Sequence, residues 1–197
     1  MPPQLLVATS NAHKTAEIQS MLGPHWEVVD LRAHPRLVLP EETGETFEAN
    51  AIIKAEAASA ALPDVLVLSD DSGLEVDALG GQPGVRSARY SGANATDAGN
   101  REKLKREMAA LNAPVYGRFR CCMAVARGGR ALRTFSGAVE GTLVLQEQGD
   151  GGFGYDPLFV PQGFDRTFGE LPAQTKNQLS HRARALAQVI EWLGGQA

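Results

Sequence analysis

Two adjacent carboxylates, Asp70 and Asp71, follow a short apolar stretch at residues 65–69. We expect this stretch to be a strand buried on both faces, with the carboxylates at its C-terminal end. Open α/β sheets gather their ligands beyond the carboxyl ends of strands. Two neighbouring carboxylates there are unfavourable unless a cation or hydrogen-bond donors neutralise them. The pair is therefore a candidate metal site, and a turn in which Asp70 bonds its own backbone is the plainer alternative.

A second group of acidic side chains lies in the stretch EETGETFE at residues 41–48. A loop of this kind is usually just solvated. Together with Asp70 and Asp71, however, it favours a site for Mg²⁺, which prefers carboxylate oxygens and retained water. Lys54 lies four residues after Asn50, so these two side chains share one face of an expected helix.

Three further segments place polar, basic or aromatic residues at expected turns and helix starts. Ala8–Asn11 joins a strand to a helix, where backbone amides attract anions, and Lys14 lies one turn further on. Gly151–Pro157 sets two aromatic residues among glycines, which suits a platform for a nucleobase. Lys176 precedes Ser-His-Arg at residues 180–182, where two cations oppose the dipole of the helix that they begin. The plain alternatives are a helix cap, a tight turn with buried aromatics and a solvated helix start.

The elements that would position these residues alternate between strands and helices. We expect strands at 4–8, 26–31, 65–69, 118–126 and 131–139, with a two-residue hairpin turn at Gly128-Gly129. Helices are expected at 12–22, 47–62, 100–111 and 180–193, and loops at 33–46, 80–100 and 149–154. In the last helix, we expect Leu186, Val189, Ile190 and Leu193 to lie on one face. This order predicts an α/β protein around a mixed sheet.

Composition excludes several classes of partner. The 19 basic and 23 acidic side chains give a net charge of −4, which offers no general basis for binding nucleic acid or an anionic membrane. No apolar run reaches the ~20 residues that span a bilayer, and the N-terminus lacks the pattern of a signal peptide. A disulfide between the adjacent Cys121 and Cys122 would be strained, so we expect free thiols and a cytoplasmic location.

Taken in order, these segments resemble the inosine triphosphate pyrophosphatase family. The resemblance runs from Leu6 to Arg182 and rests above all on SDDSGLEVDALGG, PGVRSARYSG, GGFGYDPLF and SHR. It implies an elongated fold of two lobes around a mixed sheet with flanking helices, in one domain over residues 1–197. It also implies a nucleotide cleft between the lobes, Mg²⁺ dependence and a homodimer. The implied reaction is hydrolysis of dITP, ITP and XTP to the monophosphate and pyrophosphate.

The resemblance also implies roles for individual residues. Glu41 and Asp71 would bind Mg²⁺, and Asp71 would also serve as the proton acceptor. Thr9, Asn11 and Lys14 would hold the triphosphate, with Ser10 beside them where many members carry glycine. Further substrate contacts would come from Ser72, Phe153, Gly154, Tyr155, Asp156, Lys176, His181 and Arg182. Asp70, Glu45 and Lys54 would assist.

Two other functions compete with this one. A pyrophosphatase similar to the septum-formation inhibitors, acting on pyrimidine or modified nucleotides, would share the fold, but GGFGYDP and SHR favour the purine family. A module that binds nucleotides without hydrolysing them would not need the acidic set Glu41, Asp70 and Asp71. A P-loop ATPase is excluded because the GxxxxGK[ST] motif is absent from the sequence.

Overall fold

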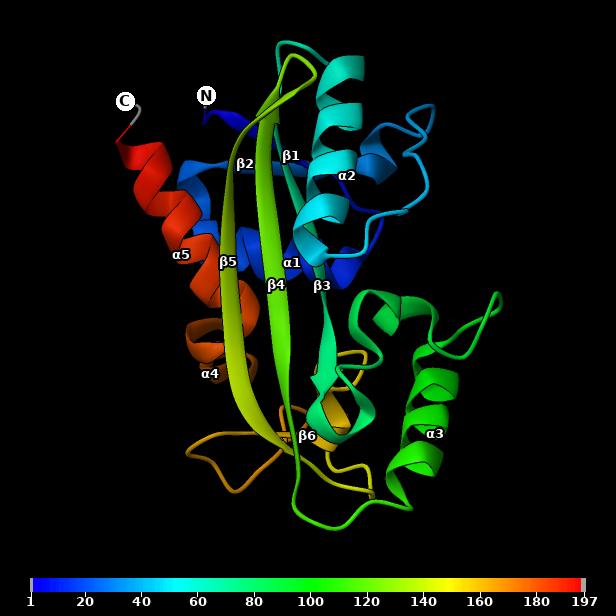
Figure 1. The fold of residues 1–197 in the computed structure, drawn as a ribbon. Helices are drawn as coiled ribbons and strands as arrows, with labels where there is room; N and C mark the ends of the chain where they lie inside the picture. The colour runs from blue at the N-terminus through cyan, green and yellow to red at the C-terminus, as the bar shows by residue number, and fades with distance from the viewer. Residues whose placement is uncertain (1, 196–197) are drawn as a thin grey trace. The chain divides into compact units, whose positions relative to one another are not determined.

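The computed structural model describes residues 2–195, whose helices and strands are shown in Figure 1. The strands are β1 (Gln4–Val7), β2 (Glu27–Asp30), β3 (Leu66–Val76), β4 (Val115–Arg127), β5 (Arg130–Leu143) and β6 (Phe159–Pro161). The α-helices are α1 (Ala12–Leu22), α2 (Phe47–Ala61), α3 (Asp97–Met108), α4 (Ala173–Leu179) and α5 (His181–Gly194). Short 3-10 helices lie at Gly23–His25, Leu31–Ala33, Asp77–Leu79, Gly84–Arg89 and Asp156–Leu158. None of the helices within residues 2–195 is long and apolar enough to cross a membrane.

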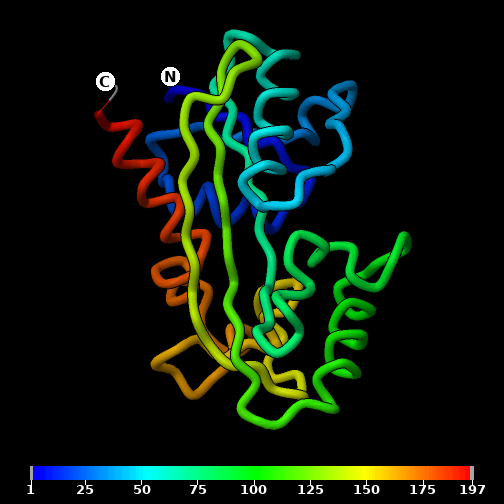
Figure 2. Tube along the Cα trace, viewed as in Figure 1, coloured from blue at the N-terminus to red at the C-terminus, as the bar shows by residue number. Residues whose placement is uncertain are grey.

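The strands of the described chain form one mixed sheet in the order β2-β1-β3-β4-β5-β6. Strand β1 pairs in parallel with both β2 and β3, so that Leu5 lies opposite Val28 on one side and Leu66 on the other. Strand β6 pairs antiparallel with β5. Gly128 and Gly129 connect the long strands β4 and β5, which run side by side in Figure 2. Both glycines have positive φ, 59° and 77°, which a tight hairpin turn requires. The predicted mixed sheet and hairpin are confirmed.

The chain divides into two compact units. Unit 1 consists of Met1–Asp71, Cys121–Gly137 and Arg182–Ala197, and unit 2 of Ser72–Arg120 and Ala138–His181. The single domain of two lobes with a cleft between them stays a prediction.

In unit 1, strand β1 is buried on both faces. Leu5 packs in a cluster with Ile18 of α1 and Leu186 of α5. Leu6 belongs to a different cluster, which contains Ala58 of α2. Because successive strand side chains point to opposite faces, the unbroken apolar run of β1 serves both clusters. This confirms the expectation of a doubly buried first strand.

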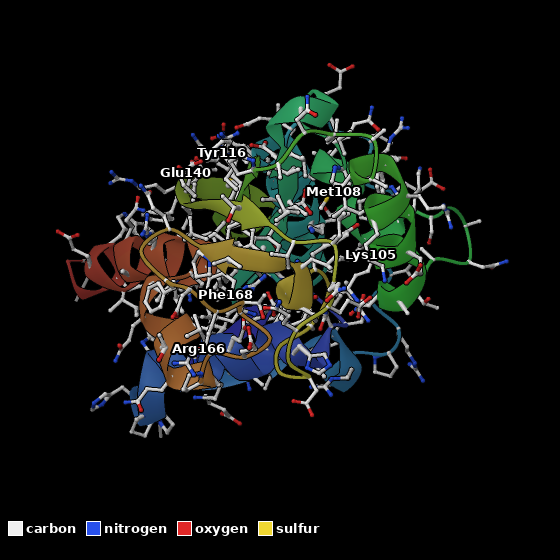
Figure 3. The ribbon with its side chains drawn as sticks, turned by 90° about the horizontal axis from the view of Figure 1, so that it is seen from below. Lys105, Met108, Tyr116, Glu140, Arg166 and Phe168 are labelled. Carbon is white, nitrogen blue, oxygen red and sulfur yellow. The ribbon has the colours of Figure 1, made fainter. Side chains whose placement is uncertain are left out.

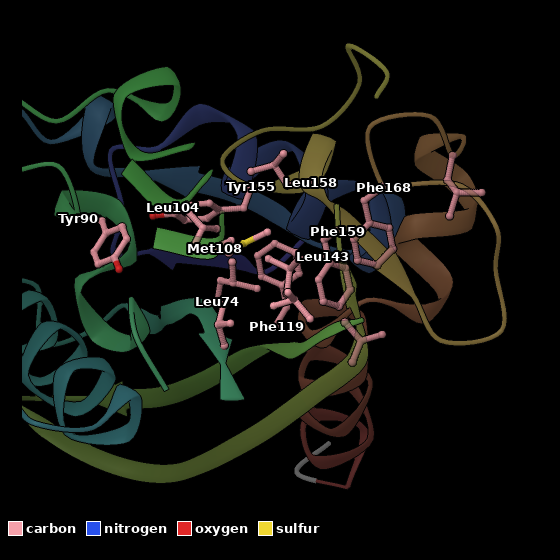
Figure 4. Close-up of a cluster of buried hydrophobic side chains, with 14 residues drawn as sticks. Leu74, Tyr90, Leu104, Met108, Phe119, Leu143, Tyr155, Leu158, Phe159 and Phe168 are labelled. Carbon is pink, nitrogen blue, oxygen red and sulfur yellow. The ribbon is translucent and has the colours of Figure 1, made fainter. Parts of the chain in front are cut away.

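Unit 2 has its own apolar core, which is drawn in Figure 4. Strand β4 supplies Phe119, and the segment after β5 supplies Phe159 and Phe168, so aromatic rings dominate one end of the cluster. Helix α3 carries Met108, which lies in the same core, and Lys105, and both are labelled in Figure 3. Lys105 forms an ion pair with Glu147.

Strand β3 continues beyond the point where the sequence predicts its end. Asp70 and Asp71 lie in the middle of β3 rather than after it, because Leu74 and Val76 extend the strand into the core of unit 2. Gly73 makes this continuation possible, since a Cβ at Gly73 would lie only 2.3 Å from Ser87 Oγ. As strand neighbours, the two aspartates point to opposite faces of the sheet.

Other differences concern element ends and short elements. Helix α3 begins earlier than predicted, at Asp97, because the Thr96 side chain caps it by accepting a hydrogen bond from Gly99 N. Strands β4 and β5 are longer than predicted, and β6 and α4 were not predicted. On α5, Leu186 and Val189 are buried, whereas Ile190 is 41% exposed. The buried stripe of α5 is therefore narrower than the apolar residues suggest.

Candidate functional site

The turn after β1 forms the helix start that the sequence predicts. Asn11 caps α1, and its Oδ1 accepts hydrogen bonds from His13 N at 2.9 Å and Lys14 N at 3.4 Å. Thr9 Oγ1 accepts a hydrogen bond from Asn11 N at 3.1 Å. Ser10 is exposed between them. The structure thus brings Thr9, Ser10, Asn11 and Lys14 together at the positive end of the α1 dipole, where anions are stabilised.

Lys14 reaches from α1 to the middle of β3. Its Nζ lies 2.5 Å from Asp70 Oδ1 and 3.4 Å from the Asp70 backbone oxygen. The Lys14 side chain is partly exposed, whereas the Asp70 side chain is fully buried. The lysine therefore links a buried anion to the surface at the start of α1.

Asp70 is the centre of a buried charge network on one face of β3. Arg182 Nε donates to Asp70 Oδ2 at 2.9 Å, and the Cys121 thiol contacts the same oxygen at 3.2 Å. Arg182 also pairs with Glu17 of α1 and is only 1% exposed. Burial opposes ionisation of Asp70, but Arg182 and Lys14 outweigh it and hold the pKa of Asp70 well below its usual value. Both cysteines are buried free thiols, as predicted.

Asp71 faces the other side of β3, toward α2. Lys54 Nζ lies 3.3 Å from Asp71 Oδ1, 2.7 Å from Glu42 Oε1 and 2.9 Å from the Asp70 backbone oxygen. Asp71 Oδ2 is buried and accepts no hydrogen bond from any residue in the range 2–195. Burial raises the pKa of Asp71 and outweighs the opposing effect of Lys54.

The acidic loop is fixed to α2 through Asn50. The side-chain oxygen of this fully buried residue accepts a hydrogen bond from Gly44 N at 2.8 Å. A Cβ at Gly44 would lie 2.7 Å from that same oxygen, so the close approach requires glycine. Glu41 and Glu45 are exposed on either side of Gly44. The loop is therefore held in place beside Lys54 rather than being merely solvated.

These carboxylates suit a hard cation. The part of the chain that the structure describes contains no group of three or more His, Cys, Asp or Glu side chains arranged to hold a metal ion. Asp71 nevertheless has a buried carboxylate oxygen, Oδ2, with no hydrogen-bond donor among the described residues. The 41–45 loop brings a further carboxylate close to Asp71, because Glu42 and Asp71 both pair with Lys54. Mg²⁺ keeps several water ligands and often binds through one or two carboxylates, so this donor set fits it.

Unit 2 holds a second group of the predicted residues. Asp156 Oδ2 accepts hydrogen bonds from Lys176 Nζ at 2.6 Å and from Phe153 N at 2.8 Å. Lys176 Nζ also lies 4.6 Å from the centre of the Phe153 ring. A Cβ at Gly152 would lie 2.1 Å from Asp156 Oδ2, so this glycine, with φ of 71°, is required. A buried ion pair therefore fixes the glycine-rich loop.

The two aromatic residues of this loop differ in their surroundings. Phe153 is partly exposed, but Tyr155 is buried in the unit 2 core and donates a hydrogen bond to the Ser87 backbone oxygen at 2.8 Å. Gly154 between them donates to Asp97 Oδ2 at 2.8 Å. Of the expected platform, Phe153 fits an accessible aromatic surface, whereas Tyr155 fits the plain alternative of a buried ring.

The predicted site residues fall into two groups. Unit 1 contains Thr9, Ser10, Asn11, Lys14, Glu41, Asp71 and Arg182, and unit 2 contains Ser72, Phe153, Gly154, Tyr155, Asp156, Lys176 and His181. No role is expected from the sequence for Asn50, Glu17 or Phe119, the last of which stacks on His181. Glu17 carries a weak sequence signal, since it lies three residues after Lys14 on one helix face.

Comparison with known proteins places the chain in a family. The model of the Ham1 family matches residues 5–192. The chain belongs to the Ham1 family. Two Ham1 structures resemble it closely: the Staphylococcus aureus Ham1 protein has a TM-score of 0.86 and 36% identity, and covers 98% of this chain and 100% of its own. A HAM1 protein from Coxiella burnetii gives the same TM-score and identity, with coverage of 98% and 99%. The α/β fold predicted from sequence is confirmed.

Curated relatives extend along almost the whole Ham1 chain. The dITP/XTP pyrophosphatase of Geobacter sulfurreducens is 45% identical over 197 residues, which are 98% of this chain and 98% of that protein. The dITP/XTP pyrophosphatase of Bacillus subtilis is 42% identical over 192 residues, or 96% of each chain. The family resemblance inferred from SDDSG, GGFGYDP and SHR is confirmed.

Proposed function

We propose that this Ham1 protein hydrolyses nonstandard purine nucleoside triphosphates, namely dITP, ITP and XTP, to the monophosphate and pyrophosphate. The names of its relatives support this activity. The structural observation that carries it lies around the backbone oxygen of Asp70. Lys14 Nζ and Lys54 Nζ both approach this oxygen, at 3.4 and 2.9 Å, and Asp71 lies next in the chain. An acidic protein has thus placed two lysine side chains around one backbone oxygen, and the next residue carries a carboxylate oxygen, Asp71 Oδ2, that has no donor within residues 2–195.

The triphosphate binds at the start of α1. Lys14 contributes an ammonium group, and the turn formed by the partly buried Thr9 and the exposed Ser10 and Asn11 contributes donors at the positive end of the helix. Since Lys14 is already held by Asp70, phosphate binding exchanges one anionic partner for another and does not require a long side chain to be ordered from solvent.

Asp71 and Glu41 would hold Mg²⁺, which would supply positive charge to neutralise phosphate oxygens and the departing pyrophosphate. The protein's own contribution is the buried Asp71 carboxylate, whose Oδ2 orients the attacking water and accepts its proton. Burial, which raises the pKa of Asp71, makes this carboxylate a better base than an exposed aspartate.

The purine is recognised by residues of the second group together with Arg182. Inosine and xanthine carry a 6-keto acceptor where adenine carries an amino donor. Lys176 and Arg182 only donate hydrogen bonds, so they favour the keto group. Ser72, Phe153, Gly154, Tyr155, Asp156 and His181 complete the substrate contacts. Asp156 holds Lys176 in place through the 2.6 Å ion pair.

The protein acts in the cytoplasm as a homodimer, and it binds neither nucleic acid nor membrane. The net charge of −4 gives no general electrostatic basis for binding nucleic acid or an anionic membrane.

Product analysis tests the reaction directly. Incubation with ITP should yield IMP and pyrophosphate, and the reaction should require Mg²⁺. It should yield neither IDP nor orthophosphate, which are the products of cleavage at the γ-phosphate. Binding of ITP without product release would instead indicate a sequestering module. Preference for pyrimidine triphosphates over ITP would favour an activity like that of the septum-formation inhibitors.

A further inference from the structure

The imidazole of His181 lies flat against the ring of Phe119 on β4. The ring centroids are 4.9 Å apart and the planes differ by only 13°. Both side chains are buried, with exposed fractions of 6% for Phe119 and 4% for His181. Offset parallel stacking is a preferred geometry for aromatic pairs. The contact lies entirely within unit 2.

Phe119 is itself fixed by two further rings (Figure 4). Phe159 meets it edge-on, with centroids 4.7 Å apart and planes at 61°. Phe168 lies 6.2 Å from Phe119 and 5.5 Å from Phe159. Three mutually packed aromatic rings therefore form a rigid surface, and His181 rests on one of its members. Leucine or methionine in place of Phe119 would fill part of the volume without offering a flat face.

The stacking constrains the direction in which His181 forms hydrogen bonds. Both imidazole nitrogens lie in the ring plane, so their hydrogen bonds leave along the edge of the ring. Since Phe119 covers one face, the imidazole cannot rotate out of that plane without losing the stack. Any base that bonds to His181 must therefore approach near the plane set by Phe119.

We propose that Phe119 is a positioning residue for purine selection, which acts by fixing the plane of His181. This inference rests on the proposed function, in which His181 contacts the purine. An aromatic pair contributes about 0.5–1.5 kcal/mol beyond buried area, which corresponds to a roughly three- to tenfold effect on binding.

Phe119→Leu, compared with Phe135→Leu, separates positioning from packing. Phe135 has the same 6% exposure but lies in the core of unit 1, where its ring packs against Trp192 at 5.9 Å. We expect both variants to lower the Tm by similar amounts. Only Phe119→Leu should lower kcat/KM for ITP, by about three- to tenfold, with a smaller loss for ATP. If Phe119→Leu does not yield folded protein, Phe119→Met replaces it.

Two further readouts identify His181 as the group through which Phe119 acts. In the His181→Ala background, Phe119→Leu should change kcat/KM for ITP by less than about twofold, because the residue that it positions is gone. In NMR spectra of the full chain, the ring current of Phe119 should shift the His181 ring protons upfield, and Phe119→Leu should remove this shift.

Four results would overturn the proposal. If Phe119→Leu lowers kcat/KM equally for ITP and ATP, Phe119 serves only to pack the core. The same conclusion follows if Phe119→Leu lowers kcat/KM for ITP as strongly in the His181→Ala background as in the wild type. If the ratio of kcat/KM for ITP to that for ATP falls in His181→Ala but stays at the wild-type value in Phe119→Leu, the positioning role of Phe119 is refuted and the base contact of His181 is left intact. An unchanged ratio in His181→Ala would refute the base contact of His181, and this inference with it.

Discussion

Asp70 and Asp71 are neighbours in the chain with different surroundings. Asp70 is enclosed by Lys14, Arg182 and Cys121, and its pKa is held low by the two cations. Asp71 meets Lys54 through one oxygen, and no donor among residues 2–195 reaches the other. The alternation of a β-strand separates the two carboxylates. Asp70 therefore pairs with cations, and Asp71 keeps the oxygen to which the proposed function assigns the chemistry.

We expect Asp71→Asn to abolish most turnover while leaving the fold intact. The amide keeps the shape of the side chain but loses the charge that holds metal and the oxygen that accepts a proton. Loss of one well-placed electrostatic group lowers kcat by ~10²–10³. Steady-state pyrophosphate release measures the loss, and Asp64→Asn, at an exposed aspartate, is the control. Activity within a few-fold of wild type would show that Asp71 is not the catalytic carboxylate.

Lys14 and Arg182 should differ in what their loss does to selectivity. Lys14→Ala should weaken all triphosphates by a similar factor, because every substrate carries the same phosphates. Arg182→Ala should lower kcat/KM mainly for ITP and XTP, by about 1–3 kcal/mol for a lost buried hydrogen bond. Since Arg182 also pairs with Asp70 and Glu17, Arg182→Lys is the variant that preserves charge if Arg182→Ala unfolds. Equal weakening of ITP and ATP by the Arg182 variants would mark it as a phosphate ligand or a structural residue.

At the level of elements, the sequence predicted well wherever an apolar pattern coincided with clear start and stop residues. Helix α1 lies between Asn11 and Gly23, and α2 ends at Ala61, close to Pro63. The end of β3 was missed because Asp70 and Asp71 read as a turn, whereas ion pairs on both faces allow these carboxylates to remain in the strand.

The short elements β6 and α4 could not be predicted from local pattern. Their three and seven residues are held by tertiary contacts, such as the pairing of Phe159 with Leu143 in the sheet and the ion pair between Lys176 and Asp156. The same limit applies to the candidate site. The motifs in the sequence predicted Lys14, Asp71 and Lys176 from their residue types. Phe119 is an apolar residue of ordinary type and Asn50 a single amide in an alanine-rich helix, and only the fold creates their contacts with His181 and Gly44.

Asp30 of β2 contacts helix α1 and the 3-10 helix Leu31–Ala33, and its carboxylate should make the free energy of unfolding depend on pH. Its Oδ2 accepts hydrogen bonds from Thr15 of α1 and from Arg32, and the hydrogen bond from Arg32 contributes most to lowering the pKa of Asp30 to about 2. Because the folded pKa lies below the usual 3.8, this contribution is fully present above pH 3.8 and is lost as the pH falls toward 2.

We therefore expect Asp30→Asn to lower the free energy of unfolding at pH 7 by about 1–2 kcal/mol. The difference between variant and wild type should shrink as the pH falls through the window from 3.8 to 2. Urea unfolding at a series of pH values measures both effects. A difference that stays constant across this window would show that the Asp30 charge contributes nothing to stability.

On the scale of the whole molecule, the proposed function requires that a protein of net charge −4 bind an anionic substrate through a local arrangement of its cations. Lys14, Lys54 and Arg182 converge on Asp70 in unit 1, and Lys176 pairs with Asp156 in unit 2. Each cation is matched by a carboxylate, so the chain can gather positive charge without large self-repulsion. Membership of the Ham1 family and relatives named dITP/XTP pyrophosphatases agree with this use of charge.

The ratio of kcat/KM for ITP to that for ATP, measured by pyrophosphate release with Mg²⁺, tests the central claim most directly. The two substrates share the same phosphates and ribose and differ only at the base. Donors arranged for a 6-keto group can reject the amino analogue by a factor of ~10⁴. We predict a preference for ITP of that order, with XTP and dITP close to ITP. Comparable kcat/KM for ATP and ITP would contradict the account.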